Sequence, residues 1–339
     1  MKTAGTLAAI LGLVSSVSAH YTFDKLLLND KQVGGDNTYI RKHSNGYMPI
    51  KFKNIPSGSI SPLDADFACN KGATGAAQVI TVKAGDKIGL RQAFGANGIQ
   101  HPGPSQIYIA PVNDAKKDKG SDWYKIHQSL ICRQGSPESL RTTAWCSWDE
   151  NNVWGIIPAT IPNGQYLLRA EHIGLHGAHD GQAEFYVSCA QIQVTGNTAT
   201  SMPGTAVKFP GAYQAGDAAL NFSLWGRSTS YLVAPGPDVI PGGTIRGSAS
   251  GAGGDKLQTV GGGKVSSSST SGTKSAEGSP VPSAAATHTA SGALPSVSLP
   301  AATATAGKPG KEGKGCNRSY PRRAAAALAA RIDAEHAEQ

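Results

Sequence analysis

The stretch Ala183-Glu-Phe-Tyr-Val-Ser-Cys-Ala-Gln-Ile-Gln-Val194 is the longest β-type run of this chain. Side chains of an extended strand point alternately to opposite faces. One face of this run is apolar, as in a core that carries a disulfide, and consists of Phe185, Val187 and Cys189. Glu184 and Tyr186 share the other face. The alternation predicts that they point together, away from that core and towards whatever the loops bring near; a solvated strand face is the simpler alternative.

Shorter β-type runs precede this stretch, and they are separated by turn signals such as Ala84-Gly-Asp86 and Pro162-Asn-Gly164. The runs are residues 79–82, 87–90, 106–109, 153–156 and 165–168. Strands at this spacing, with no long helical period, predict an all-β antiparallel sandwich or barrel. The intervals between the runs that are too long for hairpin turns are expected to be loops that build a binding surface. They are residues 31–78, 92–105, 113–150 and 172–182.

The N-terminal residues 1–19 have the layout of a secretory signal peptide, so the protein is expected to be secreted and extracellular. Lys2 precedes an apolar run from Leu7 to Val14, and small residues end in Val17-Ser-Ala19. The run is too short to span a bilayer, so no transmembrane segment is expected. Cleavage after Ala19 would leave His20 as the N-terminus, where its α-amine and its imidazole can both bind one metal ion.

The composition changes near Pro235-Gly-Pro237, which predicts a folded domain over residues 20–237. Residues 238–315 are mostly Gly, Ser, Ala, Thr and Pro, a composition typical of a disordered linker. Residues 316–339 are expected to form a short basic, alanine-rich tail and not a cellulose-binding module. The net charge of +8 is spread along the chain without a dense basic stripe, which argues against nucleic-acid binding.

The cysteines indicate an oxidising compartment. The four in the predicted domain allow three disulfide pairings, among which spacing alone does not choose; they are Cys69, Cys132, Cys146 and Cys189. Cys316 is left over, either free or intermolecular. Asn221 and Asn317 begin Asn-x-Ser sequons and are candidate N-glycosylation sites.

Two further segments place histidines next to β-type runs. Gly98-Ile-Gln-His101-Pro-Gly-Pro-Ser-Gln106 is a loop entering a strand, and its prolines restrict the backbone beside His101. Leu168-Arg-Ala-Glu-His-Ile-Gly-Leu-His176-Gly-Ala178 is a strand running into a loop. A single histidine here is more often a hydrogen-bonding loop residue than a ligand.

Taken together, His20 offers two nitrogens, His101 offers one and Tyr186 offers a weak oxygen ligand. Three nitrogens in a plane with a long axial oxygen suit copper(II). Zinc prefers a tetrahedral cage, typically with thiolates or a carboxylate, and the cysteines look committed to disulfides.

These segments resemble the fungal lytic polysaccharide monooxygenases of auxiliary activity family 9, formerly glycoside hydrolase family 61. The resemblance rests on six elements in family order from residue 20 to Pro237, so it covers the whole predicted domain. They are the signal peptide ending before His20, His101-Pro-Gly-Pro104, Gln165-Tyr-Leu-Leu-Arg169, Leu175-His176, Phe185-Tyr-x-x-Cys-Ala-Gln191 and Lys208-Phe-Pro-Gly-Ala-Tyr213.

The resemblance implies a twisted, immunoglobulin-like or fibronectin III-like antiparallel β-sandwich with long loops, and one copper ion on a flat face. The amine and imidazole of His20 and the imidazole of His101 would form a histidine brace around copper, with Tyr186 as the axial ligand. His176 would lie beside this centre, hydrogen-bond to bound oxygen species and donate protons. Together with Glu184 and Tyr186, it is a candidate catalytic residue.

The resemblance also implies a disulfide between Cys69 and Cys189, which leaves Cys132 to pair with Cys146. Tyr231 matches the family aromatic that lies flat on the substrate face. Filamentous fungi often methylate the residue that corresponds to His20.

One residue departs from the family pattern, because Glu184 stands where the family usually has glutamine. An amide both donates and accepts hydrogen bonds, whereas an ionised carboxylate only accepts. The sequence is compatible with an ionised or a protonated Glu184 beside copper.

The implied function is oxidative cleavage of β-1,4-glucan chains such as insoluble cellulose, at C1 or C4 or both, by a monomeric enzyme. It would use O2 or H2O2 and an external electron donor, either a small reductant or a protein resembling cellobiose dehydrogenase. The departure at Glu184 favours one alternative, a non-catalytic copper- or polysaccharide-binding protein that keeps the brace. A hydrolase that uses Glu171 and Glu184 is a third interpretation, although nothing in the sequence places these carboxylates across a sugar bond.

Overall fold

The computed structural model describes residues 20–93, 98–231 and 234–261. These residues form eleven strands, and their only helical elements are short 3-10 turns. The expected signal peptide, Cys316, Asn317 and the tail 316–339 lie outside the described residues.

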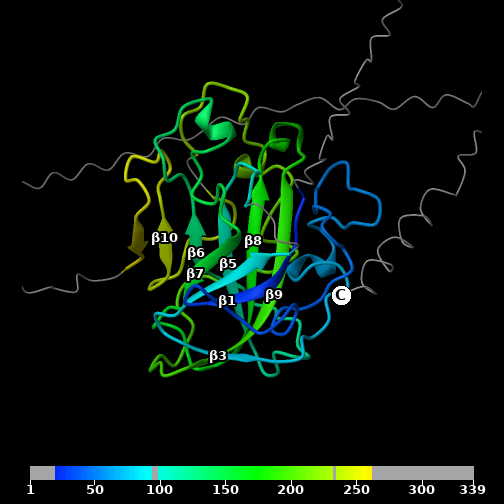
Figure 1. The fold of residues 1–339 in the computed structure, drawn as a ribbon, viewed down its shortest axis with the longest axis vertical. Coiled ribbons are helices and arrows are strands. Elements are labelled where there is room, and N and C mark those ends of the chain that lie inside the picture. The colour runs from blue at the N-terminus through cyan, green and yellow to red at the C-terminus, as the bar shows by residue number, and fades with distance from the viewer. Residues whose placement is uncertain (1–19, 94–97, 232–233, 262–339) are drawn as a thin grey trace, which may run out of the picture. The chain divides into compact units, whose positions relative to one another are not determined.

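A four-stranded antiparallel sheet has the order β2-β1-β4-β7. Its strands are β1 (Phe23–Leu28), β2 (Lys31–Val33), β4 (Lys87–Gln92) and β7 (Asn152–Ile156). A seven-stranded sheet has the order β11-β10-β6-β5-β8-β9-β3, and Figure 1 shows β10, β6, β5, β8 and β9 side by side. Its strands are β3 (Ile80–Lys83), β5 (Ser105–Val112), β6 (Tyr124–Ser129), β8 (Gly164–Gly174), β9 (Glu184–Thr195), β10 (Thr244–Arg246) and β11 (Leu257–Thr259).

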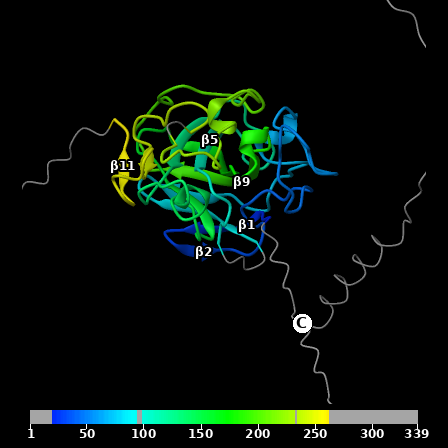
Figure 2. The same cartoon turned by 90° about the horizontal axis from the view of Figure 1, so that it is seen from above.

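The two sheets pack face to face, and Figure 2 shows β1 and β2 on one side of β5 and β9. A continuous apolar core fills the space between them and includes Phe23, Leu90, Ile107, Leu168 and Ile192. The predicted β-sandwich is therefore confirmed. Two pairs near the edges of the larger sheet are parallel, β3 with β9 and β10 with β6, so its pairing is not antiparallel throughout.

Each of the six runs predicted as strands overlaps an observed strand, from β3 through β5 and from β7 through β9. The predicted loop intervals were wrong in two places. β2 lies within residues 31–78, and β6 lies within residues 113–150.

The other face of the seven-stranded sheet is also buried, because long loops cover it. Phe185, Val187 and Cys189 of β9 pack there against loop aromatics that include Phe67, Phe209 and Tyr213. Glu184 and Tyr186 point away from this loop-covered core, as the alternation predicted, but their face is turned towards the smaller sheet and is not a solvated one. Tyr186 belongs to the core between the sheets, and both residues are nearly inaccessible to solvent.

Two disulfides tie loops to this scaffold, and both pairings implied by the resemblance are confirmed. Cys69, at the end of the 3-10 turn η1 (Ala65–Ala68), is bonded to Cys189 of β9. Cys132 is bonded to Cys146, within the loop that carries η2 (Ser139–Arg141).

The predicted start of the disordered linker at residue 238 was wrong for residues 238–261, which fold onto the sandwich. Val239 and Ile240 are buried, and β10 pairs with β6. Arg246 of β10 forms ion pairs with Glu150 at 2.7 Å and with Asp255 at 2.6 Å. This buried guanidinium fixes β10 and the loop leading to β11 on the domain. Residues 262–315 of the predicted linker lie outside the described residues.

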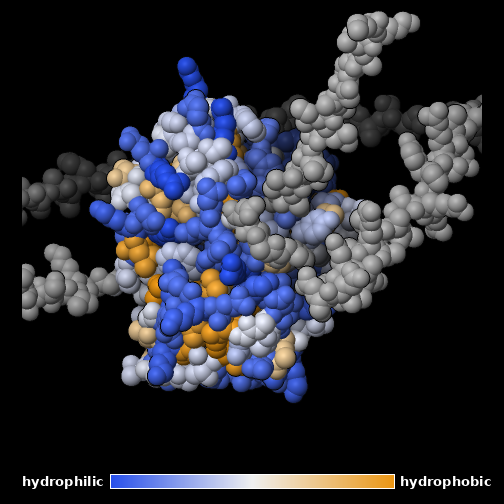
Figure 3. Space-filling model, in the orientation of Figure 1, coloured by the Kyte–Doolittle hydropathy of each residue, from blue (hydrophilic) through white to orange (hydrophobic). Residues whose placement is uncertain are grey.

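The face turned to the viewer in Figure 3 is largely hydrophilic, with apolar areas between the polar side chains. The large apolar side chains that the fold leaves exposed are Tyr47, Met48, Ile55, Leu63, Trp225 and Leu257. No helix among the described residues is long and apolar enough to cross a membrane.

We expect a chain of residues 20–237 to be less stable than one of residues 20–261. The shorter chain loses the β10–β11 hairpin and the buried Val239 and Ile240, whose burial contributes roughly 3–6 kcal/mol. For a domain of this size the loss corresponds to a decrease in Tm of at least about 6 °C. Thermal unfolding of both chains, followed by circular dichroism, measures the difference, and equal Tm values would contradict the role of the hairpin.

Candidate metal centre

Three of the candidate ligands meet at one end of the sandwich. His20 precedes β1, His101 precedes β5 and Tyr186 lies at the start of β9. The ring centroids of His20 and His101 are 5.9 Å apart, and that of Tyr186 lies 6.3 Å from His20 and 5.4 Å from His101. The structure therefore brings together the side chains that the sequence placed in three distant segments.

Tyr21 anchors the chain directly after His20. Its ring stacks on Tyr186 with centroids 4.1 Å apart, and its hydroxyl hydrogen-bonds to Nδ1 of His172, which is fully buried. β8 and β9 place His172 directly opposite Tyr186. Because Tyr21 is fixed in this layer, the backbone of His20 is held beside His101.

The loop that carries His101 is fixed to the end of β8. Pro102 and Pro104 carbonyls accept backbone hydrogen bonds from Leu175 at 2.8 Å and Ile173 at 3.0 Å. Gly103 between them has φ +154°, and a Cβ there would lie 1.8 Å from the Ile173 carbonyl oxygen. Only glycine permits this close approach.

The same contact brings His176 to His101, with ring centroids 4.8 Å apart. The expected restriction of His101 by its flanking prolines is therefore reinforced by hydrogen bonds to the next loop.

His101 has the properties of a metal ligand. Burial lowers its pKa to about 4, so the imidazole is neutral at ordinary pH. Its Nε2 is buried and has no hydrogen-bond partner. A buried polar atom without a partner is costly in a protein unless it serves another purpose, and a neutral imidazole nitrogen binds metals well.

Glu184 lies at the centre of the site, and its two oxygens have different partners. Oε2 accepts a hydrogen bond of 2.7 Å from the Tyr186 hydroxyl and lies 3.7 Å from His101 Nε2. Oε1 lies 3.1 Å from Lys51 Nζ and 3.5 Å from His176 Nε2. The carboxylate thus connects every candidate side chain of the site except His20.

The ionisation state of Glu184, which the sequence left open, follows from these contacts. Burial alone would raise its pKa, but hydrogen bonds from His176, Tyr186 and Lys51 outweigh burial and hold the pKa well below the ordinary value. Burial, followed by the charge of Glu184, raises the pKa of Tyr186 well above its ordinary value. Glu184 is therefore a carboxylate, and Tyr186 is a neutral phenol that donates to it.

The donor set fits copper better than zinc. Among the described residues, no three histidine, cysteine or acidic side chains gather as in a cage made of side chains alone. The available nitrogens are the imidazoles of His20 and His101, together with the His20 amine that cleavage after Ala19 would free. Such a set, completed by a phenol oxygen, is typical of tetragonal copper(II) sites.

Tyr231 was expected on a flat outer face, and this prediction was wrong. Its ring is 1% exposed and packs edge-to-face against Trp145 and Phe222, and its backbone N–H donates to Ala249. The segment before β11 therefore takes part in covering it.

Glu171 does not lie near Glu184. It is fully buried on the loop-covered face, opposite Val187, where it pairs with Arg169 at 2.7 Å. The two carboxylates lie on opposite faces of one sheet and cannot flank one sugar bond. Asn221 is exposed, and its amide donates to the carbonyls of Ala215 and Asp217, so its glycosylation stays a prediction.

Sequence reasoning missed Lys51 and Trp225. Lys51 lies in a long loop whose pairing with β9 has no sequence signal. Trp225 is 57% exposed, and its indole N–H donates to the carbonyl of His176 at 3.0 Å. Arg141 lies over its ring, 5.3 Å from the centroid. The signal that could have drawn attention to Trp225 is its residue type, because the chain has only five tryptophans.

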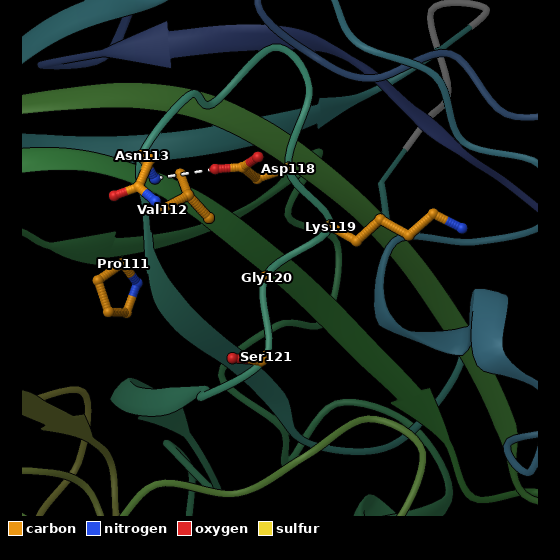
Figure 4. A pocket seen from close by; sticks show the side chains of 7 residues that line it. All are labelled: Pro111, Val112, Asn113, Asp118, Lys119, Gly120 and Ser121. Carbon is orange, nitrogen blue, oxygen red and sulfur yellow. Dashed lines mark hydrogen bonds between the residues drawn. The ribbon is translucent and has the colours of Figure 1, made fainter.

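A pocket of about 480 Å³ lies elsewhere, between the end of β5 and the following loop (Figure 4). Pro111, Val112 and Asp118 line it, and Asp118 accepts a hydrogen bond from the backbone of Asn113. His101 precedes the opposite end of β5, an eight-residue strand about 25 Å long. The pocket is therefore separate from the candidate centre.

Comparison with known proteins agrees with the geometry. The profile of Auxiliary Activity family 9 (formerly GH61) matches residues 20–231. The AA9 family lytic polysaccharide monooxygenase A of Aspergillus fumigatus is 45% identical over 252 residues, which cover 72% of this chain and 84% of that protein. The AA9 family lytic polysaccharide monooxygenase D of Emericella nidulans is 42% identical over 246 residues, 70% of this chain and 83% of that protein.

Solved structures show the same fold. The crystal structure of a cellulose-active polysaccharide monooxygenase from M. thermophila superposes with a TM-score of 0.53 at 24% identity. The match covers 66% of this chain and all of that one.

We expect Tyr21→Phe to destabilise the metal-free protein by about 1–3 kcal/mol. The variant keeps the ring that stacks on Tyr186 but leaves Nδ1 of the buried His172 without its hydrogen-bond partner. Chemical denaturation of both proteins measures the change, with Tyr47→Phe as a control because the Tyr47 side chain is exposed. Equal stability would mean that the hydroxyl does not anchor this layer.

Proposed function

This chain belongs to Auxiliary Activity family 9, the copper-dependent lytic polysaccharide monooxygenases, and from that premise we propose that its mature, secreted form cleaves β-1,4-glucan chains of cellulose by oxidation. The cut falls at C1, C4 or both, and it consumes O2 or H2O2 and electrons from an external donor. The observation that carries the proposal is the meeting of His20, His101 and Tyr186 at one end of the sandwich.

Copper would be held by the amine and imidazole of His20, the imidazole of His101 and the phenol of Tyr186. The orphaned Nε2 of His101 supports this assignment. When bound, copper supplies the one-electron chemistry that activates the oxidant, while the protein supplies orientation and electrostatics.

His176 handles protons at the site, and Glu184 orients the Tyr186 hydroxyl. The His176 side chain is 39% exposed and its Nε2 lies 3.5 Å from Glu184 Oε1, so His176 can take a proton from solvent and hold it facing the site. Glu184 has two acceptor oxygens, and one of them holds the Tyr186 hydroxyl in place. The phenol therefore keeps its proton and offers only a weak oxygen ligand.

Trp225 is the aromatic contact we propose for the polysaccharide, in place of the buried Tyr231. The indole hydrogen bond to His176 fixes Trp225 beside the site, and Arg141 supports its ring. A rigid aromatic side chain that is still 57% exposed can stack on a sugar ring at low entropic cost.

We expect copper binding to require a free His20 amine. An extra alanine before His20 turns the amine into an amide, and His101→Ala removes a third nitrogen. Each change should weaken copper binding more than about 100-fold, since even groups that only orient a ligand account for 10–100-fold. Calorimetry of the mature protein measures the affinity, and His43→Ala is the control because His43 hydrogen-bonds to Thr22 instead. Equal affinities would end the brace assignment.

We expect the copper-loaded mature protein to release oxidised cello-oligosaccharides from cellulose in the presence of ascorbate. Mass spectrometry of the soluble products decides the function. Unoxidised sugars would indicate a hydrolase, and cellulose binding without release would indicate a binding protein.

Trp225→Ala should weaken binding to cellulose about tenfold, the loss of about 1.4 kcal/mol expected for a single aromatic anchor. Copper affinity should be unchanged, since the Trp225 indole hydrogen-bonds to the backbone carbonyl of His176 and not to a proposed copper ligand. Pull-down of both proteins on cellulose measures the difference, and Leu257→Ala, at an exposed position on β11, is the control. Undiminished binding would show that Trp225 is not a contact.

A further inference from the structure

Lys51 is placed opposite Glu184 by the backbone. Ile50 and Phe185 form an isolated antiparallel bridge, with N–H···O distances of 3.0 Å from Ile50 and 2.9 Å from Phe185. In an antiparallel pair, the residues next to the bridge also face each other and share the opposite face. Ile50 and Phe185 therefore enter the loop-covered core, while Lys51 and Glu184 turn together towards the metal centre.

The resulting ion pair is largely removed from solvent. Nζ lies 3.1 Å from Oε1, and the side chains of Lys51 and Glu184 are 15% and 5% exposed. The neighbouring pair of Lys53 and Asp180 has a shorter separation of 2.7 Å, but both side chains are more than half exposed. Exposed pairs contribute little, whereas removing one partner of a buried pair leaves a costly uncompensated charge.

The two acceptor oxygens at residue 184 match two donors that face them, and one of these donors is Lys51. Two donors, the Lys51 ammonium and the Tyr186 hydroxyl, take separate oxygens of Glu184. A glutamine has one acceptor oxygen and an NH2 group that donates, so one of the two donors would lose its acceptor. Lys51 also cancels the negative charge that Glu184 brings beside the imidazoles.

We propose that Lys51 is a positioning residue that orients and neutralises Glu184, so that the carboxylate can hold Tyr186 without adding net charge to the metal centre. The part of this inference that concerns copper rests on the proposed function. An unpaired carboxylate near the metal favours the more positive copper(II) over copper(I), and an unpaired ammonium has the opposite effect. The two residues should therefore act on the metal with opposite signs.

The test uses the mature copper-loaded protein and four variants, Lys51→Met, Lys51→Arg, Glu184→Gln and the double variant Lys51→Met/Glu184→Gln. The reduction potential is expected to fall in Lys51→Met and to rise in Glu184→Gln, and the double variant and Lys51→Arg should stay near the wild-type value. The copper(II) electron paramagnetic resonance spectrum of Lys51→Met should change with the potential. Lys53→Met, which removes the same charge two residues away, should change neither.

Unfolding of the metal-free proteins gives an independent readout. Lys51→Met should raise the unfolding equilibrium constant about tenfold or more, and the double variant should recover part of this loss because no charge is left unpaired. Potentials that are equal in all variants, or single shifts of the same sign, would overturn the proposal and leave Lys51 a structural role only. If the wild type binds no copper, the proposed function fails, whereas the unfolding cycle still decides whether Lys51 and Glu184 act as a pair.

Discussion

The pairing of β8 with β9 determines which of their residues reach the candidate metal centre and which are buried under the loops. It runs without a register shift from Gly164 opposite Val194 to Gly174 opposite Glu184. Because side chains alternate along both strands, one register assigns every residue of the two strands to a face. The face towards the smaller sheet receives His172, Tyr186 and Glu184, and the face under the loops receives Glu171 and the disulfide cysteine. A slip of one residue would exchange the two sets and dismantle the site.

The two buried carboxylates of this ladder show how one kind of residue acquires two roles. Glu171 has Arg169 and the hydroxyl of Tyr213 as partners, and all three are sealed beneath the loops. Glu184 also has a cation and a tyrosine as partners, but it lies at the end of the sheet, where imidazoles and solvent come within reach. The first arrangement only compensates a buried charge. The second holds a charged carboxylate beside the candidate metal ligands. Partners alone do not distinguish them; position along the strand does.

Much of the fold and of the site could be predicted from the sequence, and the failures have physical reasons. Alternation in β9 correctly grouped Glu184 with Tyr186, but periodicity carries no information about which face loops will cover. β6 escaped prediction because it buries Lys125 and His127, whose polar atoms find partners that include the carbonyl of Pro235 and the hydroxyls of Ser129 and Thr244. β10 escaped for a similar reason, since a glycine- and serine-rich segment becomes ordered through the ion pairs of Arg246. The contacts of these strands with Pro235, Thr244 and Glu150 join residues that are 96 to 117 positions apart in the sequence.

The parallel edge strand β3 imposes an order of events on a chain made from its N-terminus. Its partner in β9 is 112 residues later, since Ile80 pairs with Ile192, and the Cys69–Cys189 disulfide spans a similar interval. At about 5–20 residues per second, a ribosome needs roughly 6–20 s to make that interval. During this time β3 has no partner in the sheet and Cys69 is a free thiol, whereas Cys132 and Cys146 are separated by only 14 residues. Secretion therefore has to protect an incomplete sheet until β9 emerges and pairs with both β3 and β8.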